Sequence, residues 1–209
     1  QQKVNLGNVK KEVIIVNDSS KDNSKKIINA LANKYKNIKN FEHEKNKGKG
    51  AAIRTGLSKI TGDYVTIQDG DLEYNPNDLK KMLKLILNNK ADVVYGSRIL
   101  GKITGFQINS HYYGNIFLSI ITGILYNKKV TDMETCYKMM KADIAKGLNL
   151  KSNRFNIEPE ITAKLLKKKY RFIEIPISYK SRSFAEGKKI NWKDGVSALI
   201  TLFKYRFFN

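Results

Sequence analysis

Three carboxylates gather in one short stretch of the sequence, Asp69-Gly70-Asp71 with Glu73 two residues on. They follow the apolar run 63–68, which predicts a strand, and ligands of open α/β sheets bind at the carboxyl ends of strands. Mg²⁺ and Mn²⁺ prefer carboxylate oxygens combined with phosphate oxygens of a substrate. The stretch therefore predicts a metal site that neutralises a leaving diphosphate, although a polar turn that only caps a helix has the same composition.

Two further polar loops follow predicted strands. In the first, Asp18 offers a carboxylate to a nucleotide base or ribose, or the loop only caps the next helix. In the second, Gly48-Lys49-Gly50 opens a helix, and a helix N-terminus near Lys49 and Arg54 favours an anion. This second loop lacks the Gly-Lys-[Ser/Thr] ending of a P-loop, so alone it is a weak signal for phosphate.

A basic loop near the C-terminus is the last candidate for binding a diphosphate. Residues 182–189 include Arg182 and Lys188 and follow a predicted strand, so the loop either folds over a diphosphate or is a solvated charge run. His43 and His111 lack metal-ligand spacing and Cys136 lacks a partner arrangement, so all three are expected to be structural.

The elements that would position these residues alternate between strand and helix. Continuous apolar runs predict strands at 12–16, 38–41, 63–68 and 91–95, and helical spacing fills the intervals between them. Downstream, we expect an apolar stretch over 116–126, a helix over 158–169, a strand over 171–179 and a helical stripe over 192–207. This order predicts an α/β fold with a mostly parallel sheet flanked by helices.

Length, composition and charge narrow the class of protein. The chain has 209 residues, 41% of them hydrophobic, which fits one soluble domain over 1–209. Its single cysteine excludes a disulfide scaffold. The net charge of +20 favours polyanionic partners. Only six of the 39 basic residues are arginine, however, and arginine is what base-reading proteins use most, so we expect no nucleic-acid partner.

The motifs together resemble glycosyltransferase family 2, whose members have the nucleotide-sugar-binding GT-A fold, and within it the polyprenyl- or dolichyl-phosphate mannosyl- and glucosyltransferases. The resemblance extends in order from residue 12 to the C-terminus. It is carried by residues 13–22, 46–54, 62–65, 68–74, 93–98, 131–138, 158–160, 176–179 and 187–190.

The resemblance implies a role for each matching position. Residues 1–98 would bind the nucleotide sugar and 99–209 the acceptor. Asp18 would contact the nucleoside, and Asp69, Asp71 and Glu73 would hold the metal on the donor diphosphate. Two groups of residues complete the expected site: Lys49, Arg54, Arg182 and Lys188 near the donor phosphates, and Arg98 with Asp132 beside the acceptor.

The expected reaction is an inverting, Mg²⁺- or Mn²⁺-dependent transfer of a hexose from a UDP- or GDP-sugar to a polyprenyl phosphate. An ionised phosphate attacks without a general base, whereas a sugar hydroxyl needs one. Asp132 would position Arg or Lys in the first case and would be the base in the second. A sugar-hydroxyl acceptor in surface polysaccharide and a non-catalytic basic binding module remain the alternatives.

Two expectations concern the surroundings of the enzyme. The stretch 116–126 and the stripe 192–207 either dock on an anionic membrane surface, or pack in the core or in a homodimer. A cytoplasmic enzyme, peripheral on the membrane, fits the first option. Family members also open with a strand that helps to bind the nucleotide, followed by a helix. Residues 1–11 resemble the tail of that helix, so we expect the first strand to be absent from this sequence.

Overall fold

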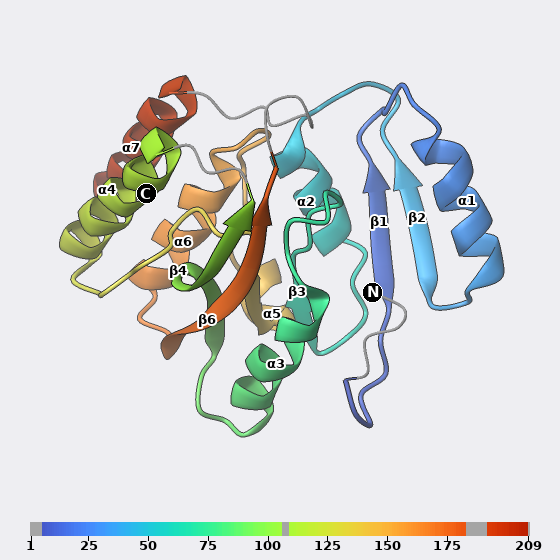
Figure 1. The fold of residues 1–209 in the computed structure, drawn as a ribbon, viewed down its shortest axis with the longest axis horizontal. Helices are drawn as coiled ribbons and strands as arrows, with labels where there is room; N and C mark the ends of the chain where they lie inside the picture. Colours follow the sequence, from blue (N-terminus) through green and yellow to red (C-terminus); the bar gives the residue numbers. More distant parts are fainter. Residues whose placement is uncertain (1–5, 106–108, 183–191, 209) are drawn as a thin grey trace.

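The computed structural model describes residues 6–105, 109–182 and 192–208. Figure 1 shows strands grouped in the middle of the molecule with helices around them. In chain order the elements are β1 (Val13–Asn17), α1 (Ser24–Lys34), β2 (Ile38–Glu42), α2 (Lys49–Leu57), β3 (Tyr64–Thr66), a 3-10 turn η1 (Pro76–Asp78), α3 (Leu79–Leu87), β4 (Val93–Gly105), α4 (Asn109–Tyr126), β5 (Lys138–Lys141), α5 (Ala142–Lys146), α6 (Ile157–Lys167), β6 (Phe172–Ser181) and α7 (Trp192–Phe207).

The described strands pair in two groups. β1 and β2 are parallel neighbours, with Val13 opposite Ile38. The other four strands lie in the order β3-β5-β4-β6, in which β4 and β6 are parallel and β5 runs antiparallel to both of its neighbours. The predicted α/β class is confirmed. The short strand β5 was not among the predicted strands, and no pairing joins β1 to β3 within the described residues.

A glutamate side chain links the two groups of strands. The Glu12 carboxylate accepts hydrogen bonds from the backbone N–H groups of Thr61 (2.6 Å) and Gly62 (2.9 Å) and from the Thr61 hydroxyl (2.9 Å). Burial alone would raise the pKa of Glu12, but these bonds lower it to about 2. The start of β1 is therefore tied to the segment that leads into β3.

The core lies on both faces of the four-stranded sheet. Successive residues of β4 point to opposite faces, because side chains alternate along a strand. Val94 packs with Met82 of α3, whereas Val93 and Tyr95 pack with helix residues that include Ile161 of α6. The hydrophobic core beside β1 and β2 is smaller, since α1 contributes no buried residue to it.

An irregularity in β4 separates two stretches of regular pairing. Ser97 pairs with Pro176 and Lys102 with Ser178, so four residues of β4 lie opposite one residue of β6. Proline cannot donate to a ladder, and bulges of this kind commonly redirect a side chain next to a functional site. Arg98 is the first residue of the irregular stretch.

Candidate active site

The three predicted metal-binding carboxylates lie on the turn that follows β3, and each has a basic partner. Asp69 Oδ2 accepts a hydrogen bond from Lys49 Nζ at 2.9 Å, and Asp71 Oδ2 accepts one from Arg182 Nη2 at 2.9 Å. Glu73 Oε1 accepts the backbone N–H of Arg182 at 2.9 Å. The structure thus brings together five of the residues that the sequence assigns to the donor site.

The turn concentrates negative charge, and the pKa values show its effect. Burial, repulsion by Asp69 and repulsion by Glu73 raise the pKa of Asp71, in spite of Arg182 and a backbone N–H bond. Burial also acts to raise the pKa of Glu73, but hydrogen bonds from the Arg182 backbone and Tyr179 lower it overall. A divalent cation at Asp69 and Asp71 would relieve this repulsion, and hard carboxylate oxygens suit Mg²⁺ or Mn²⁺.

A preformed cage of three protein ligands is not present in the part of the chain that the structure describes. Glu73 and Asp71 share Arg182 as their basic partner, since both carboxylates accept hydrogen bonds from it. The donor set that remains, two carboxylates, still fits Mg²⁺ or Mn²⁺, since these ions commonly take one or two protein carboxylates and complete their shell with substrate phosphates and water.

The turn is held in place by the loop that precedes β5. Tyr137 donates a hydrogen bond from its hydroxyl to Gln68 Oε1 at 2.5 Å, and Gln68 Nε2 donates to the Asp69 carbonyl at 2.8 Å. On the other side, the Cys136 N–H donates to the Tyr74 hydroxyl at 2.9 Å. Cys136 itself is buried and its pKa is raised by burial, in line with the structural role predicted for it.

A chain of charged side chains extends from the turn to the buried Glu158 and Lys138. Lys49 pairs with Glu158 Oε1 at 3.0 Å as well as with Asp69, and Lys138 pairs with Glu158 Oε2 at 2.5 Å. Lys138, fully buried, also donates to the Met133 and Thr135 carbonyls. The sequence analysis assigned no role to Glu158 or Lys138. The only sequence signal for Lys138 was its position directly before two apolar residues, Met139 and Met140.

Asp18 clamps the loop that leads into α2. Its carboxylate accepts hydrogen bonds from His43 Nδ1 (2.6 Å) and from the N–H groups of Lys47 (2.9 Å) and Gly48 (2.7 Å). Burial would raise the pKa of Asp18, but these donors lower it overall. His43 is buried and also contacts Thr55 at 2.9 Å, which agrees with its expected structural role. The nucleoside contact expected of Asp18 stays a prediction.

The glycines of the second polar loop allow two backbones to pack closely. A Cβ on Gly48, whose φ is +98°, would lie 2.4 Å from the Asn153 carbonyl oxygen, and one on Gly50 would lie 2.4 Å from that of Ser152. Arg54 donates to the carbonyl of Lys151 and the side chain of Asn153. In this structure Arg54 therefore holds the 151–153 loop, and its expected role near the donor phosphates stays a prediction.

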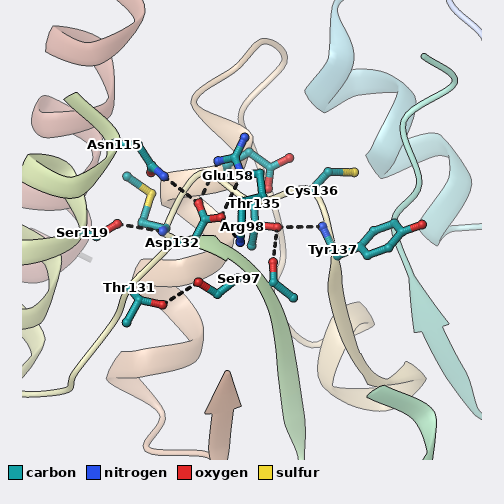
Figure 2. Close-up of polar contacts among 12 residues, drawn as sticks. Ser97, Arg98, Asn115, Ser119, Thr131, Asp132, Thr135, Cys136, Tyr137 and Glu158 are labelled. Atoms are coloured by element: carbon teal, nitrogen blue, oxygen red, sulfur yellow. Dashed lines mark hydrogen bonds and ion pairs between the residues drawn. The ribbon is translucent and has the colours of Figure 1, made fainter. Parts of the chain in front are cut away.

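Arg98 and Asp132 form the most completely bonded pair of the site (Figure 2). The Arg98 backbone N–H and Nε donate to Asp132 Oδ2, both at 2.8 Å, and Nη2 donates to Oδ1 at 2.7 Å. Asn115 Nδ2 of α4 adds a bond to Oδ1 at 2.8 Å. Burial acts to raise the pKa of Asp132, but Arg98 and Asn115 lower it overall. Asp132 is therefore an anion that positions Arg98.

A cleft of about 630 Å³ opens beside the acidic turn, in the size range of small-molecule sites. Its lining combines the turn with residues of β4 and β6, among them Lys102, Lys180 and Tyr179. A second hollow, of about 480 Å³, lies between Asn127 and Glu174, and neither of the predicted metal-binding aspartates lines it. The first cleft is the one that includes Asp69 and Glu73 of the acidic turn in its lining.

The comparison with protein families shows which family the chain belongs to. Residues 4–148 match the family described as glycosyl transferase family 2. The chain belongs to glycosyl transferase family 2. It is a glycosyltransferase, as the sequence predicted, and family membership favours an enzyme over a non-catalytic binding module.

Two relatives describe what the family does elsewhere. The chain is 31% identical over 199 residues to a UDP-N-acetylglucosamine–dolichyl-phosphate N-acetylglucosaminyltransferase of Methanococcus voltae, covering 85% of this chain and 79% of the relative. It is 27% identical over 185 residues to a dolichol-phosphate mannosyltransferase of Pyrococcus furiosus, covering 85% of this chain and 50% of the relative. Both relatives are named for transfer to a dolichol-type phosphate.

A solved structure supports the fold. Glucosyl-3-phosphoglycerate synthase of Mycobacterium tuberculosis, in complex with Mn²⁺, UDP and phosphoglyceric acid, has a TM-score of 0.67 to this chain at 14% identity. The match covers 95% of this chain and 68% of the synthase. The predicted GT-A fold is thereby confirmed. Of the predicted site residues, only Lys188 lies outside the described part of the chain.

Proposed function

We propose that this glycosyltransferase moves a hexose from a nucleoside-diphosphate sugar, UDP- or GDP-linked, to the phosphate of a polyprenyl or dolichyl lipid. The observation that carries the proposal is the pairing of Asp132 with Arg98. A carboxylate that accepts four hydrogen bonds and has a lowered pKa is a poor proton acceptor. It is well suited to holding a guanidinium in place for a phosphate.

The acceptor chemistry is consistent with that arrangement. A phosphate monoester is largely ionised near neutral pH, since its second pKa is about 6. Its oxygen forms the new bond to the anomeric carbon while the bond from that carbon to the nucleoside diphosphate breaks, so the configuration inverts. No proton needs to be removed from the attacking atom. Arg98 would bind the acceptor phosphate, and Asp132 would fix the direction of its guanidinium.

On the donor side, Asp69 and Asp71 are the residues that would hold Mg²⁺ or Mn²⁺ with the diphosphate. The ion supplies charge neutralisation for the leaving nucleoside diphosphate. Lys49 and Arg182 form ion pairs with these aspartates. With the donor bound, both side chains would also contact the phosphate oxygens. The UDP-sugar in the name of the Methanococcus relative and the Mn²⁺–UDP complex of the structural neighbour support this assignment.

A second candidate acceptor is a sugar hydroxyl, and Glu134 favours it. Burial and the nearby Glu158 raise the pKa of Glu134 to about 7, although Lys138, Arg98 and Lys49 act in the opposite direction. A carboxyl with that pKa is suited to take a proton from a hydroxyl. In that reaction Glu134, and not Asp132, would be the base.

Transfer assays with paired acceptors test the proposal. The enzyme is incubated with Mn²⁺ and radiolabelled UDP- or GDP-hexoses, and with either a short-chain, water-soluble polyprenyl phosphate or the corresponding polyprenol mixed with free oligosaccharides. We expect label to pass only to the lipid phosphate. Transfer to an oligosaccharide hydroxyl, with none to the phosphate, would overturn the proposal in favour of the second candidate.

A further inference from the structure

Two neighbouring helices at one edge of the molecule expose large apolar side chains. On α4 these are Tyr113, Phe117, Ile120 and Ile124, and Ile124 is 73% exposed. Their spacing of four, three and four residues places them along one side of the helix. The opposite side of α4 is buried and includes Leu118. α4 is therefore apolar on two sides, only one of which is used by the core.

The helix α7 repeats this arrangement. Its exposed residues are Trp192, Val196, Ile200, Phe203 and Phe207, and Ile200 is 63% exposed. They recur every three or four residues, while Ala198, Leu202 and Tyr205 of the same helix lie in the core. Packing in the core, which the sequence left open for both stretches, accounts for only one side of each helix.

The two helices are side by side (Figure 1), and the Tyr126 hydroxyl of α4 donates to the Leu202 carbonyl of α7 at 2.8 Å. We call the exposed apolar residues of both helices the α4/α7 face. Soluble monomers rarely expose contiguous apolar patches beyond a few hundred Å², and larger ones mark contact with a protein or a membrane. Within the described residues no helix combines the length and the apolar character that crossing a bilayer requires.

The charges around the α4/α7 face favour contact with a membrane over contact with a protein. Residues 109–130 contain no acidic residue, and residues 192–208 contain one, Asp194. Basic residues follow α4 at Lys128 and Lys129 and lie on α7, with Lys204 and Arg206 in its last turn. A twofold dimer would place this basic surface against its own copy, because such an interface uses the same patch twice. An anionic lipid surface instead complements it.

We propose that the α4/α7 face docks on an anionic lipid bilayer, with its apolar side chains in the interface and its lysines and arginine at the headgroups. Interfacial helices combine aromatic and aliphatic residues with such cations, and each cation near an anionic surface adds about a fivefold gain in binding. The proposal depends on the proposed function only for the statement that the acceptor is borne by the same bilayer.

The position of α4 gives this docking a consequence for the reaction. The buried side of α4 supplies Asn115 to the Asp132 carboxylate and the Ser119 hydroxyl to the Met133 N–H. The diameter of one helix, about 10 Å, therefore separates the α4/α7 face from the Arg98–Asp132 pair. A phosphate at the level of the headgroups would reach Arg98 without leaving the membrane surface.

Vesicle co-sedimentation tests the proposal on the full chain. The protein is mixed with phosphatidylcholine vesicles, with and without phosphatidylglycerol, at low and high salt. We expect binding only with phosphatidylglycerol, weaker at high salt. Replacing Ile124 and Ile200 together by Ser should weaken binding by tenfold or more, whereas Ile27→Ser, at an exposed isoleucine of α1, should leave it unchanged. Equal binding by the double variant and the control would overturn the proposal.

Two further measurements separate the remaining outcomes. Sedimentation equilibrium without lipid reports self-association: a dimer that I124S/I200S dissociates would assign the face to a second copy and overturn lipid docking. Transfer to the short-chain, water-soluble polyprenyl phosphate should be the same for the wild type and the double variant. A wild-type protein that transfers sugar to the soluble acceptor but does not bind the vesicles would refute the docking alone, and a wild-type protein that binds the vesicles without any transfer would refute the proposed function alone.

Discussion

Arg98 and Asp132 are joined by three hydrogen bonds of 2.7–2.8 Å, and the exposed pair Arg171 and Asp92 repeats the pattern with bonds of 2.7–3.1 Å from the same three donor groups. The surroundings of the two pairs differ. Asp132 is fully buried, whereas the Arg171 side chain is 49% exposed. The molecule therefore contains a matched control for the pair at the candidate acceptor site.

Asp132→Asn should destabilise the protein and remove transfer. Removing one partner of a buried ion pair leaves the other charge uncompensated, so the free energy of unfolding should fall by about 3–5 kcal/mol. Asp92→Asn breaks the exposed pair, and its effect should be much smaller because solvent screens it. Urea unfolding measures both. Equal effects in the two variants would contradict the stabilising role of the buried Asp132 charge.

Asp71→Asn should separate ligand binding from stability. Burial and the neighbours Asp69 and Glu73 raise the pKa of Asp71 above its usual 3.8. The folded state therefore keeps a proton that the unfolded chain loses, so the free energy of unfolding falls as pH rises from 3.8 to the raised pKa. The variant without ligand should therefore unfold at the same temperature as the wild type or higher at pH 8. It should also lose the gain of about 5 °C or more that saturating UDP or GDP with Mn²⁺ gives the wild type.

Thermal unfolding with each nucleotide, with and without Mn²⁺, makes this measurement. Asp63→Asn, at an exposed carboxylate just before β3, is the control and should keep the nucleotide effect. A nucleotide effect that does not need metal, or one that Asp71→Asn retains, would contradict the assignment of Asp71 to the donor metal.

The sequence was sufficient for the parts of the fold that depend on local pattern. Apolar runs located β1 and β2 to within a residue, and the carboxyl ends of parallel strands share one edge of a sheet. The carboxylates after β3 could therefore be assigned to a site. β5 could not be predicted in this way, because its four residues include two lysines, and Lys138 is buried only through tertiary contacts with Glu158.

The same limit applies within the site. Arg98 and Asp132 are 34 residues apart, and Arg98 lies in the irregular stretch of β4 that begins after the Ser97–Pro176 pair. From the sequence, the carboxylate of Asp18 is expected to bind a ligand. In the structure it accepts hydrogen bonds from the side chain of His43 and from the backbone of the loop that ends at Gly48. Side-chain types and strand ends are visible in a sequence, whereas the partners that satisfy each charge are set by packing.

Gly50→Ala should destabilise the protein by about 1–3 kcal/mol. A Cβ at this position would come within 2.4 Å of the Ser152 carbonyl oxygen and 2.8 Å of the Asn153 carbonyl carbon, so the 151–153 loop would have to move. Gly114→Ala in α4 is the control, because nothing lies within 4 Å of its Cβ. There alanine should raise stability by up to about 1 kcal/mol. A loss at both positions in urea unfolding would refute the close-packing argument.

Glu134→Gln should change the pH dependence of stability. The pKa of Glu134 is raised to about 7 by burial and by Glu158, above its usual 4.5. The folded state therefore keeps a proton that the unfolded chain loses, and stability present below pH 4.5 is lost as pH rises to about 7. Glutamine does not titrate, so the free energy of unfolding of the variant should increase relative to that of the wild type between pH 5 and pH 8. Glu44→Gln is the exposed control.

The same variant separates the two acceptor classes. If the acceptor is a phosphate, Glu134→Gln should keep transfer within a few-fold of the wild type at pH 7, because no proton has to be removed. If the acceptor is a hydroxyl and Glu134 is its base, transfer should fall by about 10²–10⁴-fold. The acidic limb of the pH–rate profile near pH 7 should then disappear as well. Activity measured from pH 5.5 to pH 8.5 on both proteins distinguishes these outcomes.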